Sequence, residues 1–308
     1  MGSAQQDVQL KDFNSIFRLD GKVAVVTGGS RGLGLHAASG LLQAGCSKVF
    51  ITSRKAKACE EACAALNALP NKHPSAKAIS VPADSSKVSE IERLVAEVAK
   101  HTDKVDILFA NAGATWGAKF DDHPDNAFSK VMDLNVKSVF FTIQKYVQLP
   151  SHQSFQPIVR YGVTDKIYSR FAPLLEKAAG PSSPARVIVT GSTAGVGIGS
   201  TGANSTPAYS ASKAAVLHLA RNLAVELGPR GILVNGIAPG FFPSKMANGL
   251  MEASGGQERL AASNANGRLG QPEDIAAAVV YLSSRASGHV NGDTLVLDGG
   301  QVLVRPSL

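Results

Sequence analysis

Short apolar runs alternate with amphipathic stretches along most of the sequence, and this alternation limits the folds open to the chain. Seven runs have the length and β-branched content of strands: residues 23–27, 48–52, 76–82, 105–110, 186–190, 232–237 and 294–297. Helical patterns fill most of the segments between them, without a hairpin turn signal. Strands separated by helices run parallel, and helices cover both faces of such a sheet. The sequence therefore predicts an α/β fold, a single doubly wound domain with a seven-stranded parallel sheet.

The first predicted strand leads directly into a glycine-rich segment, Thr27–Gly34, which opens a helical pattern. Glycines at such a turn let the backbone approach a pyrophosphate, which then lies over the N-terminus of the following helix. A glycine cluster between a first strand and a helix is much more specific than one in an ordinary turn. We therefore expect a Rossmann-type dinucleotide site, with contacts from Gly28, Ser30, Arg31, Gly32, Leu33 and Gly34.

Basic residues follow the second predicted strand, where an NAD site places a carboxylate for the ribose hydroxyls. The strand leads into Ser53-Arg54-Lys55, and the next acidic residue is Glu60. A guanidinium binds phosphate oxygens well, and Arg31 in the glycine segment would reach the same phosphate from the other side. We therefore expect NADP(H) as the cofactor, with Ser53 and Arg54 beside its adenosine ribose.

Tyr209 and Lys213 stand four positions apart in a helical pattern that runs from Ala208 to Leu227. Residues at this spacing lie on one face of a helix. An ammonium group beside a phenol favours the phenolate, so we expect Lys213 to lower the pKa of Tyr209 from its ordinary value near ~10. Such a tyrosine can donate and accept a proton near neutral pH. The spacing alone also fits two residues on a solvated helix face, so this interpretation depends on the rest of the chain.

Together these motifs resemble the short-chain dehydrogenase/reductase family over about residues 20–300. The resemblance rests on motifs in the family's order: Thr27-Gly28-x3-Gly32-x-Gly34, Asn111-Ala112-Gly113, Asn135, Ser192, Tyr209-x3-Lys213 and Pro239-Gly240. It implies an NAD(P)-dependent oxidoreductase on a Rossmann fold. It also implies that Tyr209 is the general acid, that Lys213 lowers its pKa and binds the nicotinamide ribose, and that Ser192 hydrogen-bonds the substrate carbonyl.

The resemblance implies further roles around this centre. Asn135 is expected to hold a water that relays protons to Lys213, and Asp84 is expected to contact the adenine. Asn111, Ala112 and Gly113 are expected at the central sheet and the cofactor, although Ala110 stands where the family commonly has another asparagine.

At the nicotinamide carboxamide the resemblance implies Pro239, Gly240 and Ser244, the last at a position where the family often has threonine. It also implies a homotetramer or homodimer.

Residues 146–170 have no counterpart in the family pattern, and they interrupt the helical pattern that begins near Asp125 and carries Asn135. Without them, residues 143–145 would join Phe171–Leu175 as an ordinary helix end. About 20 helical residues span roughly 30 Å, so we expect this insertion at the sheet edge opposite Tyr209 and not as a lid. Two interpretations stay open: a surface loop near a subunit interface, and a retained intron, which sequencing of the mature transcript would test. The domain is expected at residues 21–308, after a polar N-terminal arm at residues 1–20.

Aromatic residues follow the predicted strands at the edge where ligands bind. Trp116 follows the fourth strand, and Phe241, Phe242 and Met246 follow the sixth. Loops at the carboxyl ends of parallel strands form the ligand crevice, so these side chains are expected to line an apolar pocket or to pack in the core. Both stretches are similar to the 3-oxoacyl reductases associated with rhamnolipid synthesis, which implies reduction of a 3-oxoacyl or related apolar ketone, free or bound to a carrier protein or coenzyme A. A sugar or polyol dehydrogenase and a catalytically silent NADP-binding regulator stay open as alternatives.

The composition argues against several other classes of protein. Cys46, Cys59 and Cys63 have no metal-ligand spacing, so reduced thiols and no metal are expected. The net charge of +7 comes from scattered residues without a basic block, so no nucleic-acid partner is expected. No apolar run is long enough to span a membrane, and the N-terminus lacks a signal-peptide pattern. We therefore expect a cytoplasmic enzyme without a membrane partner.

Overall fold

The sheet of the computed structural model has seven parallel strands in the order β3-β2-β1-β4-β5-β6-β7, which confirms the predicted fold. The structure describes residues 8, 12–144, 170–244, 251 and 255–304. The strands are β1 (Val23–Thr27), β2 (Lys48–Thr52), β3 (Lys77–Ser80), β4 (Ile107–Ala110), β5 (Ala185–Thr190), β6 (Ile232–Pro239) and β7 (Thr294–Leu297). Strands β1, β2 and β7 have the predicted bounds, whereas β3 and β4 are shorter than their apolar runs and β6 is longer.

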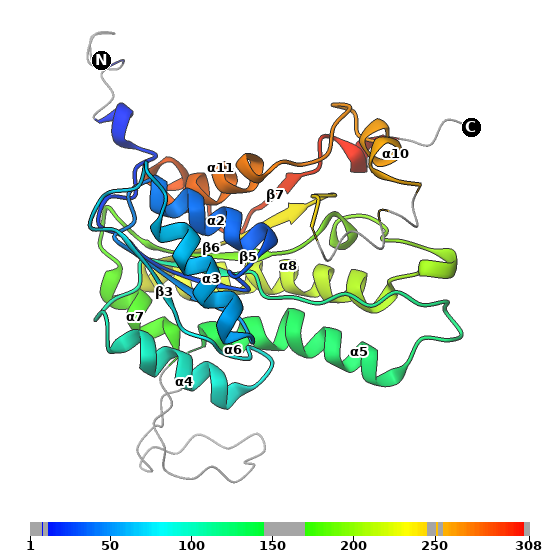
Figure 1. The fold of residues 1–308 in the computed structure, drawn as a ribbon, viewed down its shortest axis with the longest axis horizontal. Coiled ribbons are helices and arrows are strands. Elements are labelled where there is room, and N and C mark those ends of the chain that lie inside the picture. Colours follow the sequence, from blue (N-terminus) through cyan, green and yellow to red (C-terminus); the bar gives the residue numbers. More distant parts are fainter. Residues whose placement is uncertain (1–7, 9–11, 145–169, 245–250, 252–254, 305–308) are drawn as a thin grey trace.

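Helices cover both faces of the sheet (Figure 1). One face carries α2 (Gly32–Gln43), α3 (Ala56–Asn67) and α11 (Pro272–Ser283). The other carries α4 (Val88–Ala99), α5 (Asp125–Met132), α6 (Ser138–Ile143), α7 (Phe171–Ala178) and α8 (Pro207–Leu227). A short helix, α10 (Gln257–Ala262), lies beyond the end of β7 in Figure 1.

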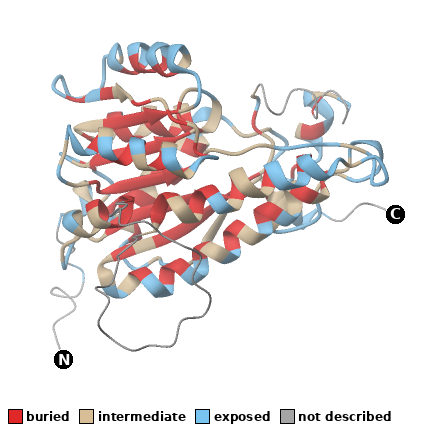
Figure 2. Cartoon of the chain, turned by 90° about the horizontal axis from the view of Figure 1, so that it is seen from below, coloured by how far each residue is buried: buried red, intermediate tan, exposed pale blue. Residues whose placement is uncertain are grey.

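Each face of the sheet has its own hydrophobic core, because successive strand residues point to opposite faces. Val25 packs in one cluster with residues of α4, α6, α7 and α8, whereas its neighbours Ala24 and Val26 pack in the other with residues of α2, α3 and α11. Figure 2 shows the result, a buried sheet between helices whose outer faces are exposed. The continuous apolar runs of the sequence follow from this burial on both faces.

The order of the strands places a crevice at their carboxyl ends. Strand β1 lies beside both β2 and β4, so the connections that leave β1 and β4 diverge to opposite faces. In doubly wound sheets the ligand binds at this switch point. The glycine segment leaves β1 there, and Asn111 leaves β4 there.

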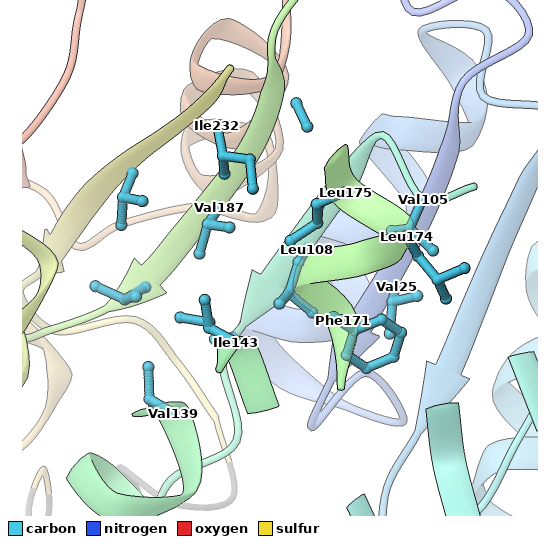
Figure 3. Packing of buried hydrophobic residues seen from close by; sticks show 14 of the residues in the cluster. Val25, Val105, Leu108, Val139, Ile143, Phe171, Leu174, Leu175, Val187 and Ile232 are labelled. Atoms are coloured by element: carbon cyan, nitrogen blue, oxygen red, sulfur yellow. The ribbon is translucent and has the colours of Figure 1, made fainter. Parts of the chain in front are cut away.

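The predicted insertion lies outside the described residues, except for its last residue, Arg170. The chain on both sides of it is well packed, because Ile143 and Phe171 are fully buried in the same hydrophobic cluster (Figure 3). The Arg170 guanidinium donates a hydrogen bond to the Gln144 side chain, lies 4.6 Å from the centre of the Phe141 ring and approaches Glu92 to 3.8 Å. The two ends of the segment are therefore held together.

Part of the predicted N-terminal arm belongs to the packed structure. Leu19 is buried in the cluster beneath α2 and α11, and its backbone N–H donates to Ala44. A 3-10 turn, Phe13–Ser15, precedes it, and the Arg285 side chain donates to Ser15. Ser15 and Leu19 of the predicted arm thus contact the rest of the domain.

Candidate active site

Asn111 fixes the junction between β1, β4 and β5. Its backbone N–H donates to the Thr27 hydroxyl at 3.0 Å, and its side-chain amide donates to the carbonyls of Thr27 and Gly28 at 3.1 and 3.3 Å. Its carbonyl oxygen accepts from the Thr190 hydroxyl at 3.1 Å. The Thr27 hydroxyl also accepts from the backbone of Ala112 at 3.0 Å. These bonds place Asn111 at the central sheet, as the resemblance implies.

The glycine segment passes so close to Asn111 that side chains would not fit. A Cβ atom on Gly34 would lie 2.4 Å from the Gly28 carbonyl oxygen and 2.6 Å from the Asn111 amide nitrogen. Gly28 and Gly32 have φ angles of 65° and 53°, a region that favours glycine. Gly32 begins α2, so the free N–H groups of this helix face the crevice. The segment therefore fits a dinucleotide pyrophosphate.

The predicted phosphate-binding arginines are both exposed. Arg31 is the N-cap residue of α2, and Arg54 follows β2. Ser53, between β2 and Arg54 in the chain, is half-buried, with its hydroxyl 3.1 Å from the Cys59 sulfur. Asp84, which follows β3, accepts hydrogen bonds from the backbone and the hydroxyl of Ser86 at 3.1 and 2.7 Å. These residues follow neighbouring strands, β1, β2 and β3, at the same edge of the sheet.

Ser192 and Tyr209 meet at the end of β5. Ser192 begins a 3-10 turn, Thr193–Gly195, and its hydroxyl accepts from the backbone of Ala194 at 3.2 Å. Burial raises the pKa of Tyr209, while a hydrogen bond with the Ser192 side chain acts in the opposite direction. The expected lowering of the Tyr209 pKa by Lys213 is therefore wrong for this structure. Loss of hydration around the phenol is the larger cause, and the Lys213 ammonium nitrogen lies 5.6 Å from the centre of the Tyr209 ring.

Lys213 lies on the same face of α8 as Tyr209 and is buried. Its side chain is 4% exposed, and its ammonium group donates to the Thr190 carbonyl at 2.7 Å. Burial lowers the pKa of Lys213 from 10.5 to about 8. The ammonium form still dominates at neutral pH, so a positive charge is held at the floor of the crevice.

Asn135 lies in a π-helical turn, Asp133–Lys137, between α5 and α6, where the sequence predicts one continuous helix. Its side-chain oxygen accepts from the Ala114 backbone at 2.8 Å, and its amide donates to the Ala114 carbonyl and the Ser212 hydroxyl, both at 2.9 Å. A Cβ atom on Gly113 would lie 3.1 Å from the Asn135 oxygen and 3.5 Å from the Lys213 nitrogen. Asn135, Gly113 and Lys213 therefore lie together. Wide turns of this kind are frequent at functional sites.

The segment after β6 reaches the glycine segment from the other side. A Cβ atom on Gly32 would lie 3.8 Å from that of Ser244, so Ser244 closes this part of the crevice. Pro239 ends β6, and Gly240 donates to the Leu297 carbonyl at 2.9 Å. Phe242 is buried in the core beneath α2 and α11, its ring packed against Gly270.

Phe241 and Phe242, both expected at a pocket or in the core, line a cavity of about 260 Å³ at the ends of β6 and β7, and Phe242 packs in the core as well. Trp116 is exposed, Phe241 is half-buried and Met246 lies outside the described residues.

Several contacts at the site involve residues without a predicted role. Thr190 holds both Asn111 and Lys213, and Ser212 holds Asn135. Cys59 contacts Ser53 through its sulfur. Ser212 stands directly before Lys213, one turn after Tyr209, and this position is the one signal in the sequence that could have indicated its role.

All three cysteines are free, in keeping with the predicted reduced thiols, and all three are buried. Among the helices of the described residues, none is long and apolar enough to cross a membrane.

Comparisons with known proteins agree with this geometry. The family model described as short chain dehydrogenase matches residues 22–159, and the model described as enoyl-(acyl carrier protein) reductase matches residues 166–301. The rhamnolipids biosynthesis 3-oxoacyl-[acyl-carrier-protein] reductase of Pseudomonas aeruginosa is 38% identical, with 92% of this chain and 97% of that protein covered. The 2-dehydro-3-deoxy-D-gluconate 5-dehydrogenase of Dickeya dadantii is 32% identical over 92% of this chain and 96% of its own length.

Among solved structures, the RhlG/NADP active-site complex of Pseudomonas aeruginosa matches with a TM-score of 0.79 and 37% identity. The match covers 93% of this chain and 98% of that chain. The chain therefore belongs to the short-chain dehydrogenase family and is an oxidoreductase.

Proposed function

We propose that this protein is an NADPH-dependent reductase that converts an apolar ketone, a 3-oxoacyl compound or a close relative, to a secondary alcohol. The observation that carries the proposal is the meeting of Ser192, Tyr209 and Lys213 at the carboxyl edge of the sheet, beside a glycine segment that fits a dinucleotide. A protein that only binds the cofactor has no use for a tyrosine held against a serine hydroxyl.

Two observations support NADP(H) as the cofactor. Arg31 and Arg54 are exposed beside the glycine segment and the end of β2, where guanidinium groups bind a 2′-phosphate well. The similar Pseudomonas structure is a complex with NADP. The cofactor contacts would come from the glycine segment, Ser53, Asp84, Asn111–Gly113, Pro239, Gly240 and Ser244.

When bound, NADPH supplies a hydride to the carbonyl carbon of the substrate. The protein must then stabilise the negative charge on the carbonyl oxygen and deliver a proton to it. Ser192 and Tyr209 donate hydrogen bonds to that oxygen, and Tyr209 transfers its proton. The Lys213 ammonium stabilises the phenolate that remains, and Asn135 orients the backbone of Ala114 beside it.

Exposed apolar side chains beside the site support an apolar substrate. Trp116 and Phe120 lie on the loop after β4, and Val196 and Ile198 lie on the loop after β5, with Ile198 88% exposed. The two loops contact each other where the Ala118 N–H donates to the Ser205 carbonyl at 3.0 Å. An acyl chain leaving the carbonyl near Tyr209 would pass along these side chains, whereas a sugar acid would gain little there.

The test is a series of 3-oxoacyl esters of increasing chain length, assayed by NADPH consumption. Each buried methylene contributes up to ~0.8 kcal/mol, so kcat/KM is expected to rise by up to roughly fourfold per methylene until the apolar surface is covered. Ile198→Ser should flatten this rise and leave the shortest ester unaffected. Val225→Ser, which changes an exposed valine near the other end of α8, is the matched control. A chain-length series that is flat in the wild type would contradict the proposal.

The sugar-acid dehydrogenase among the relatives supports a second candidate, reduction of a ketogluconate. Faster turnover of 2-dehydro-3-deoxy-D-gluconate or 5-keto-D-gluconate than of every 3-oxoacyl ester would favour it. Tight NADPH binding without turnover of any ketone would favour a regulator.

Tyr209→Phe separates catalysis from binding. The variant lacks the proton donor, so turnover should fall by at least about a hundredfold, while the affinity for NADPH stays within about threefold. A Tyr209→Phe enzyme with wild-type turnover would refute the assigned mechanism.

The homotetramer or homodimer stays a prediction, which light scattering on the purified protein tests.

A further inference from the structure

A small cavity lies at the amino edge of the sheet, opposite the active site. It has a volume of about 20 Å³ and lies between the starts of β4 and β5 and the end of α11. Its lining includes four cationic side chains, Arg18, Lys22, Arg186 and Arg285, but only one carboxylate, Asp106. A cavity of this size holds roughly one particle the size of a water molecule.

Two buried side chains that line the cavity have donors without an acceptor in the described part of the chain. The Arg186 side chain is 3% exposed, and its Nε and Nη1 groups have no hydrogen-bond partner there. Its Nη2 group donates to the Ser284 carbonyl at 2.9 Å. The Ser283 hydroxyl is also buried and without a partner. Unmatched buried donors are unfavourable, and more so on a charged group.

Each of the other three cations of the cavity lies within 4.0 Å of a carboxylate oxygen. Arg18 forms an ion pair with Asp20 at 2.6 Å, and Lys22 forms one with Asp106 at 2.8 Å. Arg285 approaches Asp12 to 4.0 Å. The second oxygen of Asp106 accepts from the Val23 backbone at 3.0 Å and lies 3.9 Å from Lys104.

Among the described residues, Arg186 is the one cation of this cavity that has no carboxylate within ion-pair distance. Burial lowers the pKa of Arg186 to about 10, so the group still carries its charge at neutral pH. A buried charge without a counter-charge is strongly unfavourable.

We propose that this cavity binds a monatomic anion of the size of chloride, held by Arg186 and the Ser283 hydroxyl. A single anion would neutralise the guanidinium and accept from the free donors at once. A water molecule would satisfy the donors but leave the charge uncompensated, and space for about one water-sized particle favours a monatomic anion over sulfate or phosphate. The site lies at the amino ends of the strands, so its role is to stabilise the fold and not to take part in turnover.

The direct test replaces chloride with bromide in crystals of the full-length protein. An anomalous bromine peak in contact with Arg186 and Ser283 is the expected result. An ordered water there, without an anomalous signal, would overturn the proposal.

The solution test compares thermal unfolding in sodium chloride and in sodium acetate at equal ionic strength. Saturating chloride should raise the wild-type Tm by an amount on the order of 3 °C. Arg186→Met, which removes the charge at similar volume, should lose this response, and Ser283→Ala should weaken it even if Arg186→Met fails to fold. Arg230→Met is the matched control, because Arg230 pairs with Glu176 at 2.6 Å and should keep the response. An equal chloride response in wild type, Arg186→Met and Ser283→Ala would refute the site.

Discussion

Replacing Lys213 with methionine should make the protein more stable at neutral pH while it removes activity. Burial lowers the pKa of Lys213 from 10.5 to about 8, so the folded state binds this proton less tightly than the unfolded state. One pKa unit corresponds to about 1.4 kcal/mol, so holding the ammonium form in the fold costs about 3 kcal/mol below pH 8. Loss of the hydrogen bond to the Thr190 carbonyl returns roughly 1 kcal/mol of that gain. The free energy of unfolding of Lys213→Met should therefore exceed that of the wild type by about 2 kcal/mol at pH 7.

The sign of the pH dependence gives a sharper test. Below the folded pKa of about 8 both states of the wild type are protonated, and the full cost is present. As the pH rises from about 8 toward 10.5, the folded state loses its proton first and the cost disappears. The advantage of Lys213→Met should thus shrink by about 3 kcal/mol across this window, so that the wild type becomes the more stable protein at its upper end.

Urea unfolding followed by far-ultraviolet circular dichroism measures this difference at half-unit steps of pH. Taking the difference between variant and wild type removes the contributions of all other titrating groups. Lys57→Met, at an exposed lysine of α3, is the control for the removal of one charge. Parallel pH profiles for wild type and Lys213→Met would refute the argument that burial of the catalytic lysine is unfavourable for the fold.

Two further substitutions test the cofactor side of the crevice. Gly34→Ala places a methyl group 2.4 Å from the Gly28 carbonyl oxygen, so it should lower both the Tm, measured by thermal unfolding, and the affinity for NADPH, measured by fluorescence titration. Gly180→Ala, at a position where nothing lies within 4 Å of the added methyl group, should change neither quantity. Cys59→Ala removes the sulfur beside the Ser53 hydroxyl, so the preference for NADPH over NADH should fall roughly threefold, a change that a loss of packing alone would not produce and that Cys63→Ala should not share.

The backbone of this site follows closely from the sequence. The glycine segment, Asn111 and the Tyr209–Lys213 pair depend on strand ends and on helix spacing, which are local patterns. The order of the parallel strands then brings these residues to one edge of the sheet. For this reason the residues predicted after β1, β4, β5 and β6 meet in one crevice.

The electrostatics did not follow from the sequence in the same way. The direction of the Tyr209 pKa depends on how much water the surrounding fold removes, and no spacing rule contains that quantity. The π-helical turn at Asn135 also depends on the surrounding fold. The Asn135 side chain bonds to Ala114, 21 positions away, and no local pattern contains that contact. Phe242 shows how far sequence prediction reaches for apolar residues. The sequence pattern of an aromatic residue at a strand end is the same whether its side chain contacts a ligand or packs against Gly270.

The hydrogen bond between Gln144 and Arg170 has a consequence for how this gene can change. Because Gln144 and Arg170 are in contact, the chain leaves the packed domain and returns to it at one place. The entropic cost of closing a loop between two such points rises by only about 0.6 kcal/mol for each doubling of its length. Selection on folding would therefore constrain the two anchoring residues and their neighbours more than the number of codons between them.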